Sequence, residues 1–332
     1  MTPDPTIRPR RYPPPEFPPR RPKLFAKTPP AIFPPILGLL GLVLALRAGL
    51  AHLGLPSAPA DLLAGLVIPL WAFAALAYAM KLARRPAVMA EDLRVMPARA
   101  GLAAATMGGM TSAGLLAPYA PDAALALLWA ALVLHGVVAA MIVRTLLTLP
   151  PEARGVNPGW HMIFVGFIVG GLSAALMGQT ALAQVLLWAM LGPAVLIWAV
   201  SLNQLRLGSP PAPLRPMLAI HIAPAALLGS VASVTGPAEL ATGLSVLALA
   251  ILATLLVSLR WITAAGFSPL WAAFTFPLTA AAGALIRQGG LLADLGLGLL
   301  GLALIAVPLI AWQVLRRWPG GQLAARTNTA EA

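Results

Sequence analysis

The chain has 332 residues, of which 59% are hydrophobic and only 10% are charged, and its formal net charge is +12. Soluble proteins carry about 25% charged residues, so this composition excludes a soluble enzyme, a secreted domain and a disordered chain. The chain has no cysteine, which excludes disulfides, thiolate metal sites and thiol nucleophiles. The composition therefore predicts a protein that has lipid as its solvent.

Residues 1–28 differ from the rest of the chain. They contain nine prolines and seven basic residues, a composition that cannot bury a core and predicts a disordered cytoplasmic tail. Attraction of this tail to anionic lipid is a second interpretation, since each basic residue near a membrane contributes about 1 kcal/mol. The apolar stretch 31–46 is not a cleaved signal peptide, because the region before it is too long and many comparable stretches follow.

Apolar segments recur from Pro30 onward, each of about 20 residues, the length that a helix needs to cross a bilayer. Short turn-like breaks such as Gly54-Leu55-Pro56-Ser57 separate them, and none of these breaks can hold a soluble domain. The ten segments are 31–54, 59–81, 98–118, 121–146, 159–178, 180–204, 214–235, 237–260, 268–287 and 291–315. We therefore predict an all-α polytopic membrane protein with ten transmembrane helices within residues 29–317, followed by a cytoplasmic C-terminal tail, residues 318–332.

The basic residues lie almost entirely in the loops on one side of the predicted segments. If the N-terminus is cytoplasmic, every lysine and arginine except Arg47 and Arg287 falls on the cytoplasmic side, as the positive-inside rule requires. This sorting predicts a multi-pass protein of the inner (plasma) membrane with both termini in the cytoplasm. Because topology explains the positive charge, we expect the lipid bilayer and no nucleic acid as a partner.

Prolines mark a longer period along the chain. Each odd-numbered segment begins near a proline on the predicted cytoplasmic side, namely Pro30, Pro97, Pro158, Pro213 and Pro269. The spacing between successive prolines of this set is about the length of one helical hairpin. It predicts five tandem hairpins, and repeated units of this kind often surround a shared axis.

Acidic side chains are scarce inside the segments. Asp61, Asp122, Glu239 and Asp294 lie near predicted outer helix ends, and no acidic residue lies in the middle of a segment. This argues against a proton-relay pump, a carboxylate-lined cation channel and a prenyltransferase with magnesium-binding aspartates. We therefore expect no enzymatic activity and no cofactor.

The four histidines, His52, His135, His161 and His221, lack the paired spacing of haem or copper ligands, and we expect no metal site. His161 and His221 lie near the predicted cytoplasmic ends of odd-numbered segments. Each is either an interfacial histidine hydrogen-bonded to a carbonyl or a polar group at the inner mouth of a pathway.

Small and helix-breaking residues concentrate on the odd-numbered segments, for example Gly38, Gly109, Gly170 and Pro224. One interpretation is close helix packing through small residues. The other is a narrow inner ring around a conduit, in which prolines free backbone carbonyls and direct helix ends toward the path.

Three stretches resemble those of one protein family. The most specific is the run Phe267-Ser268-Pro269-Leu270-Trp271-Ala272-Ala273-Phe274-Thr275-Phe276-Pro277-Leu278. The stretch from Leu214-Arg215-Pro216 to Pro224 and the stretch 30–39 resemble the family's seventh and first helices. Over roughly residues 28–315 the chain resembles the tellurite-resistance/dicarboxylate transporter family, which includes the slow-type anion channels of plant guard cells. It departs from many relatives in having the single Trp271 where they have two tryptophans.

The resemblance implies five tandem hairpins whose odd-numbered helices line a central pore, and homotrimers in which each protomer has its own pore. It also implies that Phe276 blocks the pore midway and acts as its gate. Further candidates are pore-lining or kink residues and residues at the inner mouth: Pro277, Thr275, Phe274, Pro224, Gly38, Gly109 and Gly170, and His161, His221 and Arg215.

The function that follows is a gated anion channel or uniporter of the bacterial inner membrane for small inorganic or organic anions. A pore without carboxylates and with basic flanks favours anions through its long-range field. The first alternative is a secondary carrier that exports tellurite or sulfite-like oxyanions or moves C4-dicarboxylates with protons. The second, a membrane enzyme or haem–copper protein, is opposed by the absence of intramembrane carboxylates and of histidine pairs.

Overall fold

The computed structural model describes residues 23–332, and within this range the chain forms helices and no strands. Its long helical elements are η1–α1 (Pro30–Ile32 and Phe33–His52), α2 (Ala58–Arg84), α4 (Met96–Leu116), α5 (Pro121–Thr148), η3–α6 (His161–Val165 and Phe167–Leu176), α7 (Thr180–Leu207), η4–α8 (Ala212–His221 and Ile222–Thr235), α9 (Ala238–Val257), η5–α11 (Pro269–Phe274 and Thr275–Gln288) and α12 (Gly290–Leu315). Each coincides with one of the predicted segments. The prediction did not include the short elements α3 (Val88–Asp92), η2 (Pro151–Ala153), α10 (Leu259–Ile262) and α13 (Gln322–Arg326).

Eight of the described helices are long and apolar enough to cross a membrane. The two remaining elements of the predicted ten are α4 and η3–α6. Helix α4 is long enough, with 21 residues, but its glycine, serine and threonine residues lower its mean hydropathy. The apolar stretch His161–Leu176 is shorter than the others. The number of ten membrane spans therefore stays a prediction.

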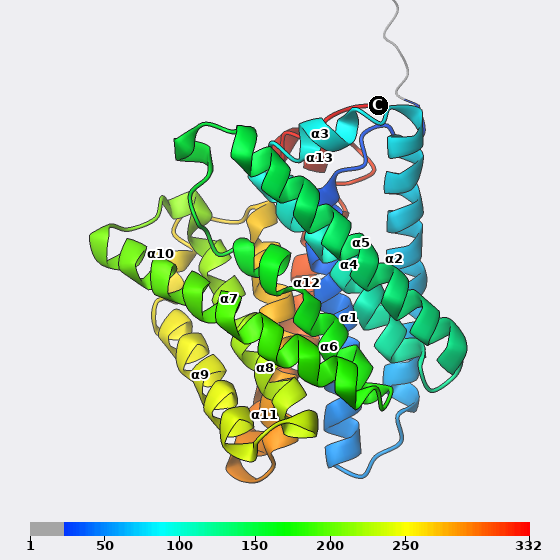
Figure 1. Ribbon diagram of the computed structural model, residues 1–332, viewed down its shortest axis with the longest axis vertical. Helices are drawn as coiled ribbons and strands as arrows, with labels where there is room; N and C mark the ends of the chain where they lie inside the picture. Colours follow the sequence, from blue (N-terminus) through cyan, green and yellow to red (C-terminus); the bar gives the residue numbers. More distant parts are fainter. Residues whose placement is uncertain (1–22) are drawn as a thin grey trace, which may run out of the picture.

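The elements form an inner and an outer layer. In the apolar part of three inner elements, η1–α1, η4–α8 and η5–α11, 61 to 83% of the residues are buried, against 22 to 33% in α2, α5, α7, α9 and α12. In Figure 1 the outer helices α2, α5, α7 and α9 surround the inner α1, α8 and α11. These helices rich in small residues thus lie inside, which agrees with one of the two interpretations of their composition.

The inner helices contact one another in a closed ring. Helix α1 packs against α4, α4 against α6, α6 against α8, α8 against α11, and α11 returns to α1. Each inner helix also packs against the outer helix that follows it in the chain. The chain order is therefore also the order of neighbours around one axis.

Prolines set where the inner helices begin. Pro35, Pro224 and Pro277 each occupy the third position of an α-helix, in α1, α8 and α11 respectively. A proline is tolerated there because the first backbone N–H groups of a helix have no intrahelical acceptor. The preceding turns η1, η4 and η5 are 3₁₀ helices, and η3 is a π-helical turn. Four of the five inner helices in residues 23–332, namely α1, α6, α8 and α11, are therefore preceded by an irregular turn, whereas α4 begins directly as an α-helix.

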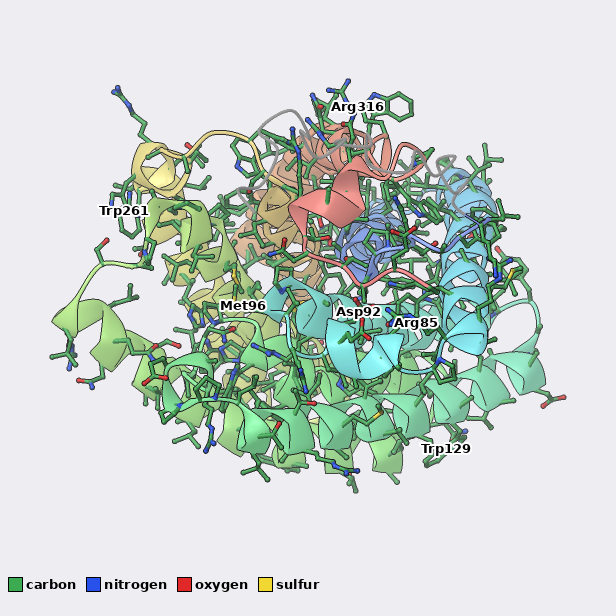
Figure 2. The ribbon with its side chains drawn as sticks, turned by 90° about the horizontal axis from the view of Figure 1, so that it is seen from above. Arg85, Asp92, Met96, Trp129, Trp261 and Arg316 are labelled. Carbon is green, nitrogen blue, oxygen red and sulfur yellow. The ribbon has the colours of Figure 1, made fainter. Side chains whose placement is uncertain are left out.

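Both ends of the described chain lie on one end of the bundle, which we call the terminal face (Figure 1). Viewed onto this face, Asp92 and Arg85 lie over the interior, whereas Trp129 and Trp261 lie at the periphery (Figure 2). The segment predicted as a C-terminal tail packs here. Leu323 of α13 is fully buried, and the backbone N–H of Ala332 donates to the carbonyl of Ala26. Most of the predicted N-terminal tail, residues 1–28, lies outside the described residues.

A buried ion pair holds the terminal face together. Lys81 of α2 lies 3.0 Å from Asp92 of α3, and neither side chain has exposed surface. Lys81 also donates to the carbonyl of Thr28, while Asp92 accepts from the hydroxyl of Tyr78 and the backbone N–H of Ala330. We call these five residues the terminal clasp. The clasp joins α2 and α3 to the chain just before α1 and to the last residues of the chain.

Candidate functional site

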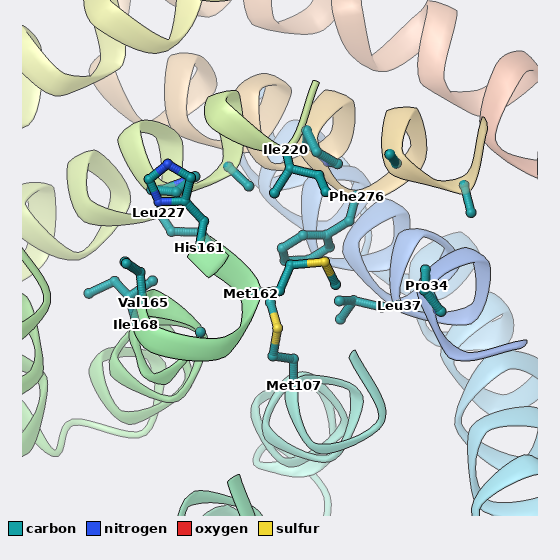
Figure 3. A pocket seen from close by; sticks show the side chains of 16 residues that line it. Pro34, Leu37, Met107, His161, Met162, Val165, Ile168, Ile220, Leu227 and Phe276 are labelled. Carbon is teal, nitrogen blue, oxygen red and sulfur yellow. The ribbon is translucent and has the colours of Figure 1, made fainter. Parts of the chain in front are cut away.

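A cavity of about 40 Å³ lies on the axis of the inner ring, on the side of the terminal face, and we call it the terminal-side cavity. All five inner elements contribute to its wall, which is almost entirely apolar (Figure 3). The lining residues are Pro34, Leu37, Met107, His161, Met162, Val165, Gly166, Ile168, Ile220, Ala223, Pro224, Leu227, Ala272, Ala273, Phe276 and Pro277.

A second cavity, of about 20 Å³, lies farther along the same axis, and we call it the far-side cavity. It is lined by residues of α1, α6, α8 and α11, namely Gly41, Leu44, Ala45, Val169, Leu172, Leu227, Ser230, Phe276, Thr279, Ala280, Gly283 and Arg287. Each cavity holds little more than one or two water molecules. The path along the axis is therefore narrow.

Phe276 borders both cavities. Its side chain lines both of them, and only Leu227 is also shared. The residue is 7% exposed, so its side chain is packed within the walls of the two cavities. The carbonyl of Phe276 accepts a hydrogen bond from the Thr279 hydroxyl, and the hydroxyl of the preceding Thr275 donates to the carbonyl of Ala272.

Helix α1 packs directly against the side chain of Phe276. A Cβ atom built at Gly41 would lie 2.5 Å from the Thr279 hydroxyl and 2.8 Å from Cδ2 of Phe276. At Gly38 it would lie 2.1 Å from the Thr275 hydroxyl. These distances are shorter than van der Waals contact, so the approach of α1 to α11 requires glycine at both positions.

The charge along the axis is positive or absent. The residues that line the two cavities include no aspartate and no glutamate. Arg287 lines the far-side cavity and donates to the carbonyl of Gly283. Within residues 23–332 no carboxylate pairs with Arg287, whereas Arg47, the other arginine at that end, is 2.7 Å from Asp61. The far-side cavity therefore carries a guanidinium charge that no acidic side chain neutralises.

A profile described as "voltage-dependent anion channel", the SLAC1 family, matches residues 27–316. This is nearly the whole chain, including both axial cavities and Phe276. The chain belongs to the SLAC1 family. A comparison with curated proteins gave no match. The resemblance read from the three sequence stretches is thereby confirmed.

In this SLAC1-family chain the predicted site residues fall into two groups. Phe276, Pro277, Pro224 and His161 line the terminal-side cavity. Thr275 is fully buried directly beside Gly38, at the contact of α1 with α11. The run that carries the most specific resemblance therefore supplies the residues on the axis.

The second group lies away from the axis. A Cβ at Gly109 would meet Trp71 of α2 and Ala131 of α5, and one at Gly170 would meet Leu132 of α5. These two glycines serve close helix packing, the other interpretation of the small residues. The nearest side chain to each belongs to an outer helix, and Met110 of the inner helix α4, which a Cβ at Gly170 would also meet, lines neither axial cavity.

Phe274 and Arg215 also lie off the axis. Phe274 lines a lateral cavity between η5, α9 and α12, where its ring packs edge-on against Trp271. The guanidinium of Arg215 stacks on Trp261, 4.3 Å from the ring centroid, and donates to the carbonyl of Pro210. Neither residue lines the terminal-side cavity.

The expectation that the histidines form no pair is wrong. Nε2 of His161 lies 3.0 Å from Nδ1 of His221, and both rings are buried. The two residues are 60 positions apart, and the irregular turns η3 and η4 bring them together. A third histidine, His135, is also buried, between the Thr106 hydroxyl and the carbonyl of Ile163. Within residues 23–332 no group of three or more potential metal ligands is found.

The close approach of α1 to Phe276 predicts a stability loss for Gly41→Ala. The added methyl group overpacks the contact with Thr279 and Phe276, which typically costs about 1–3 kcal/mol. In the double variant Gly41→Ala/Phe276→Ala the loss becomes smaller than the sum of the two single losses, because the clashing ring is absent. Thermal unfolding in detergent measures both.

Gly65→Ala is the matched control for this cycle. Gly65 lies on the outer helix α2, and a Cβ there meets nothing within 4 Å. Alanine is the better helix former, so this variant is expected to be as stable as the wild type or slightly more stable. Additive losses for Gly41→Ala and Phe276→Ala would contradict direct contact between α1 and the ring.

Proposed function

We propose that the protein is a gated anion channel of the bacterial inner membrane, in which Phe276 closes a conduit along the axis of the inner ring. The observation that carries this proposal is that Phe276 lines both axial cavities, a position that it shares only with Leu227 among the residues that line them. An apolar constriction closes a pore by excluding water as well as by filling space. No charged latch is needed.

The permeant ions are small inorganic or organic anions. The lining residues contain no carboxylate that would attract cations, and Arg287 adds a positive charge at the far-side cavity. Such a path selects anions by its field and not by a tight binding site. Membership of an anion-channel family supports the same conclusion.

The proposal includes the arrangement in the membrane. Ten helices cross the bilayer as five tandem hairpins, and the terminal face lies in the cytoplasm. The distribution of basic residues supports this orientation, since Arg47 and Arg287 are the two that face the opposite side. By family resemblance the protein is a homotrimer in which each protomer contains its own conduit.

Anion efflux from proteoliposomes tests the proposal. Vesicles loaded with the potassium salt of chloride, nitrate or sulfite and containing the Phe276→Ala variant are expected to lose anion much faster than empty vesicles when a potassium ionophore carries the compensating charge. Without the ionophore, efflux is expected to stop as soon as a diffusion potential has formed. Efflux at the rate of empty vesicles for all three anions, in both wild type and variant, would contradict a channel.

A further inference from the structure

The lateral cavity that Phe274 lines lies outside the axial path. Its volume is about 300 Å³, and its wall is formed by α9, α10, α12, η5 and the starts of α8 and α11. It shares no lining residue with either axial cavity. On its rim, Leu256 of the outer helix α9 and Leu302 of the outer helix α12 are each 47% exposed. The cavity therefore opens sideways from the bundle, toward the surface that faces lipid in a membrane protein.

The wall of the lateral cavity is apolar, and its two polar side chains are already hydrogen-bonded. The Thr263 hydroxyl donates to the carbonyl of Leu259 over 2.7 Å, and Nε1 of Trp271 donates to the carbonyl of Gly266 over 3.0 Å. Water in a cavity needs two to four polar partners, and an apolar cavity stays dry. An empty void costs stability in proportion to its volume. The cavity therefore favours an apolar occupant.

The end of the lateral cavity nearest the terminal face is basic. Arg260 lies on α10 between Leu259 and Ile262, which both line the cavity, and Arg316 directly follows α12. Both arginines are exposed, and Arg316 lies at the edge of the terminal face in Figure 2. Within residues 23–332 neither has an ion-pair partner. Between positions 240 and 330 the sequence has one acidic residue, Asp294, near the opposite end of α12.

Aromatic side chains mark the same end as a membrane interface. Trp261 of α10 is 38% exposed, and the guanidinium of Arg215 stacks on its ring. The guanidinium of Arg317 lies 4.8 Å from the ring centroid of Phe267, in the loop between α10 and η5. Tryptophan and arginine side chains are typical of the headgroup level of a bilayer. The lateral cavity thus extends from this level into the hydrocarbon region of the adjoining leaflet.

We propose that the lateral cavity binds one acyl chain of an anionic phospholipid, and that Arg260 and Arg316 hold its headgroup. A phospholipid supplies both complementary parts in one molecule. Its methylene chain matches the dry wall, and its phosphate complements two guanidinium groups that no carboxylate neutralises. The site does not depend on anion conduction and goes beyond the proposed function.

The bound chain lies behind the turn that carries Phe276. Phe274 and Leu278, on either side of Phe276 in the sequence, line the lateral cavity, whereas Phe276 itself lines the axial cavities. The start of α11 therefore has the conduit on one side and the lateral cavity on the other. An acyl chain in this cavity supports that turn from outside.

Native mass spectrometry of the detergent-purified protein with added phosphatidylglycerol tests the site. The wild type is expected to retain one tightly bound lipid per chain. Ala306→Trp fills the cavity from α12 and should raise the apparent Kd of this lipid at least about tenfold. The matched control is Ala253→Trp, at an exposed position of α9 that does not line the cavity, and it should keep the wild-type Kd.

The headgroup contact has its own pair of variants. Arg260→Gln is expected to lower the preference for phosphatidylglycerol over phosphatidylcholine about fivefold, since each basic residue near an anionic surface contributes to attraction. Arg144→Gln, at an exposed position near the end of α5 on the same side, should leave the preference unchanged. An equal preference in the wild type and Arg260→Gln would overturn the role of Arg260.

Tryptophan fluorescence gives a second measurement that needs no cavity-filling variant. Phosphatidylglycerol with brominated acyl chains is expected to quench the wild type in a saturable manner, because Trp271 lines the cavity. Trp271→Phe should remove the saturable part, whereas Trp188→Phe, on the exposed surface of α7, should retain it. Absence of saturable quenching, or equal lipid loss in Ala306→Trp and Ala253→Trp, would overturn the site. A changed number of chains per particle in Ala306→Trp, with lipid binding unchanged, would assign the cavity to a second copy of the chain and overturn it as well.

Discussion

Phe276→Ala is expected to raise the anion conductance of the reconstituted protein at least about tenfold, which corresponds to a barrier lowered by about 1.4 kcal/mol. The truncation removes the ring that lines both the terminal-side and the far-side cavity. The two cavities then join, and the new space is wide enough for water to follow the anion. The variant should remain folded, because the removed ring borders existing cavities and the cost of truncating a phenylalanine depends on the void that results.

The matched control for this experiment is Phe274→Ala. Phe274 is two residues away in the same motif, but it lines the lateral cavity and packs against Trp271. Its truncation removes the same number of atoms off the axis, so single-channel recordings should show the wild-type conductance. Equal conductance changes in both variants, or none in Phe276→Ala, would show that Phe276 does not close the conduit.

Lys81→Met is expected to lower the free energy of unfolding by about 3–5 kcal/mol, the loss seen when one partner of a buried ion pair is removed. Asp92 stays buried in this variant without its cationic partner, with Tyr78 and the backbone N–H of Ala330 as its remaining donors. Because the clasp joins both ends of the described chain, the C-terminal residues should also become accessible to protease. Thermal unfolding in detergent and limited proteolysis measure the two effects.

A neighbouring exposed pair provides the control. Arg85 and Glu91 lie 2.8 Å apart, with side chains 40% and 46% exposed, and Glu91→Gln should cost less than about 1 kcal/mol. The double variant Lys81→Met/Asp92→Leu should lose less stability than Lys81→Met alone, because no buried charge is left unpaired. A double variant that is less stable than Lys81→Met would contradict the clasp as an ion pair.

Much of the fold could be predicted from the sequence, because a helix that crosses a bilayer needs about 20 consecutive apolar residues and is easily recognised. Long apolar segments and the prolines near their starts predicted helix positions close to those observed, as for Pro30 and Pro269, where η1 and η5 begin. The inner position of the odd-numbered segments was one of two interpretations of their small residues, and the family resemblance implied it. Helix α4 shows the limit of hydropathy, because the same small residues that allow burial make it less apolar than a lipid-facing helix.

The polar contacts could not be predicted in the same way. His161 meets His221 across 60 residues through a π-helical turn and a 3₁₀ turn, and neither turn has a reliable sequence signature. The Lys81–Asp92 pair depends on the tertiary fold of the terminal face. Gly109 and Gly170 have the same composition signal as Gly41, but only the position of neighbouring helices decides whether a glycine faces the conduit.

The reversal potential of Phe276→Ala in a tenfold gradient of potassium chloride tests the anion conduit most directly. A channel that conducts only the anion reverses at the chloride equilibrium potential, about 59 mV in magnitude for a monovalent ion, and the predicted value lies close to that limit. Replacing chloride by gluconate on one side of the membrane should abolish the current that anions carry from that side. A reversal potential at the potassium equilibrium potential, or at zero, would contradict an anion path through the ring of inner helices.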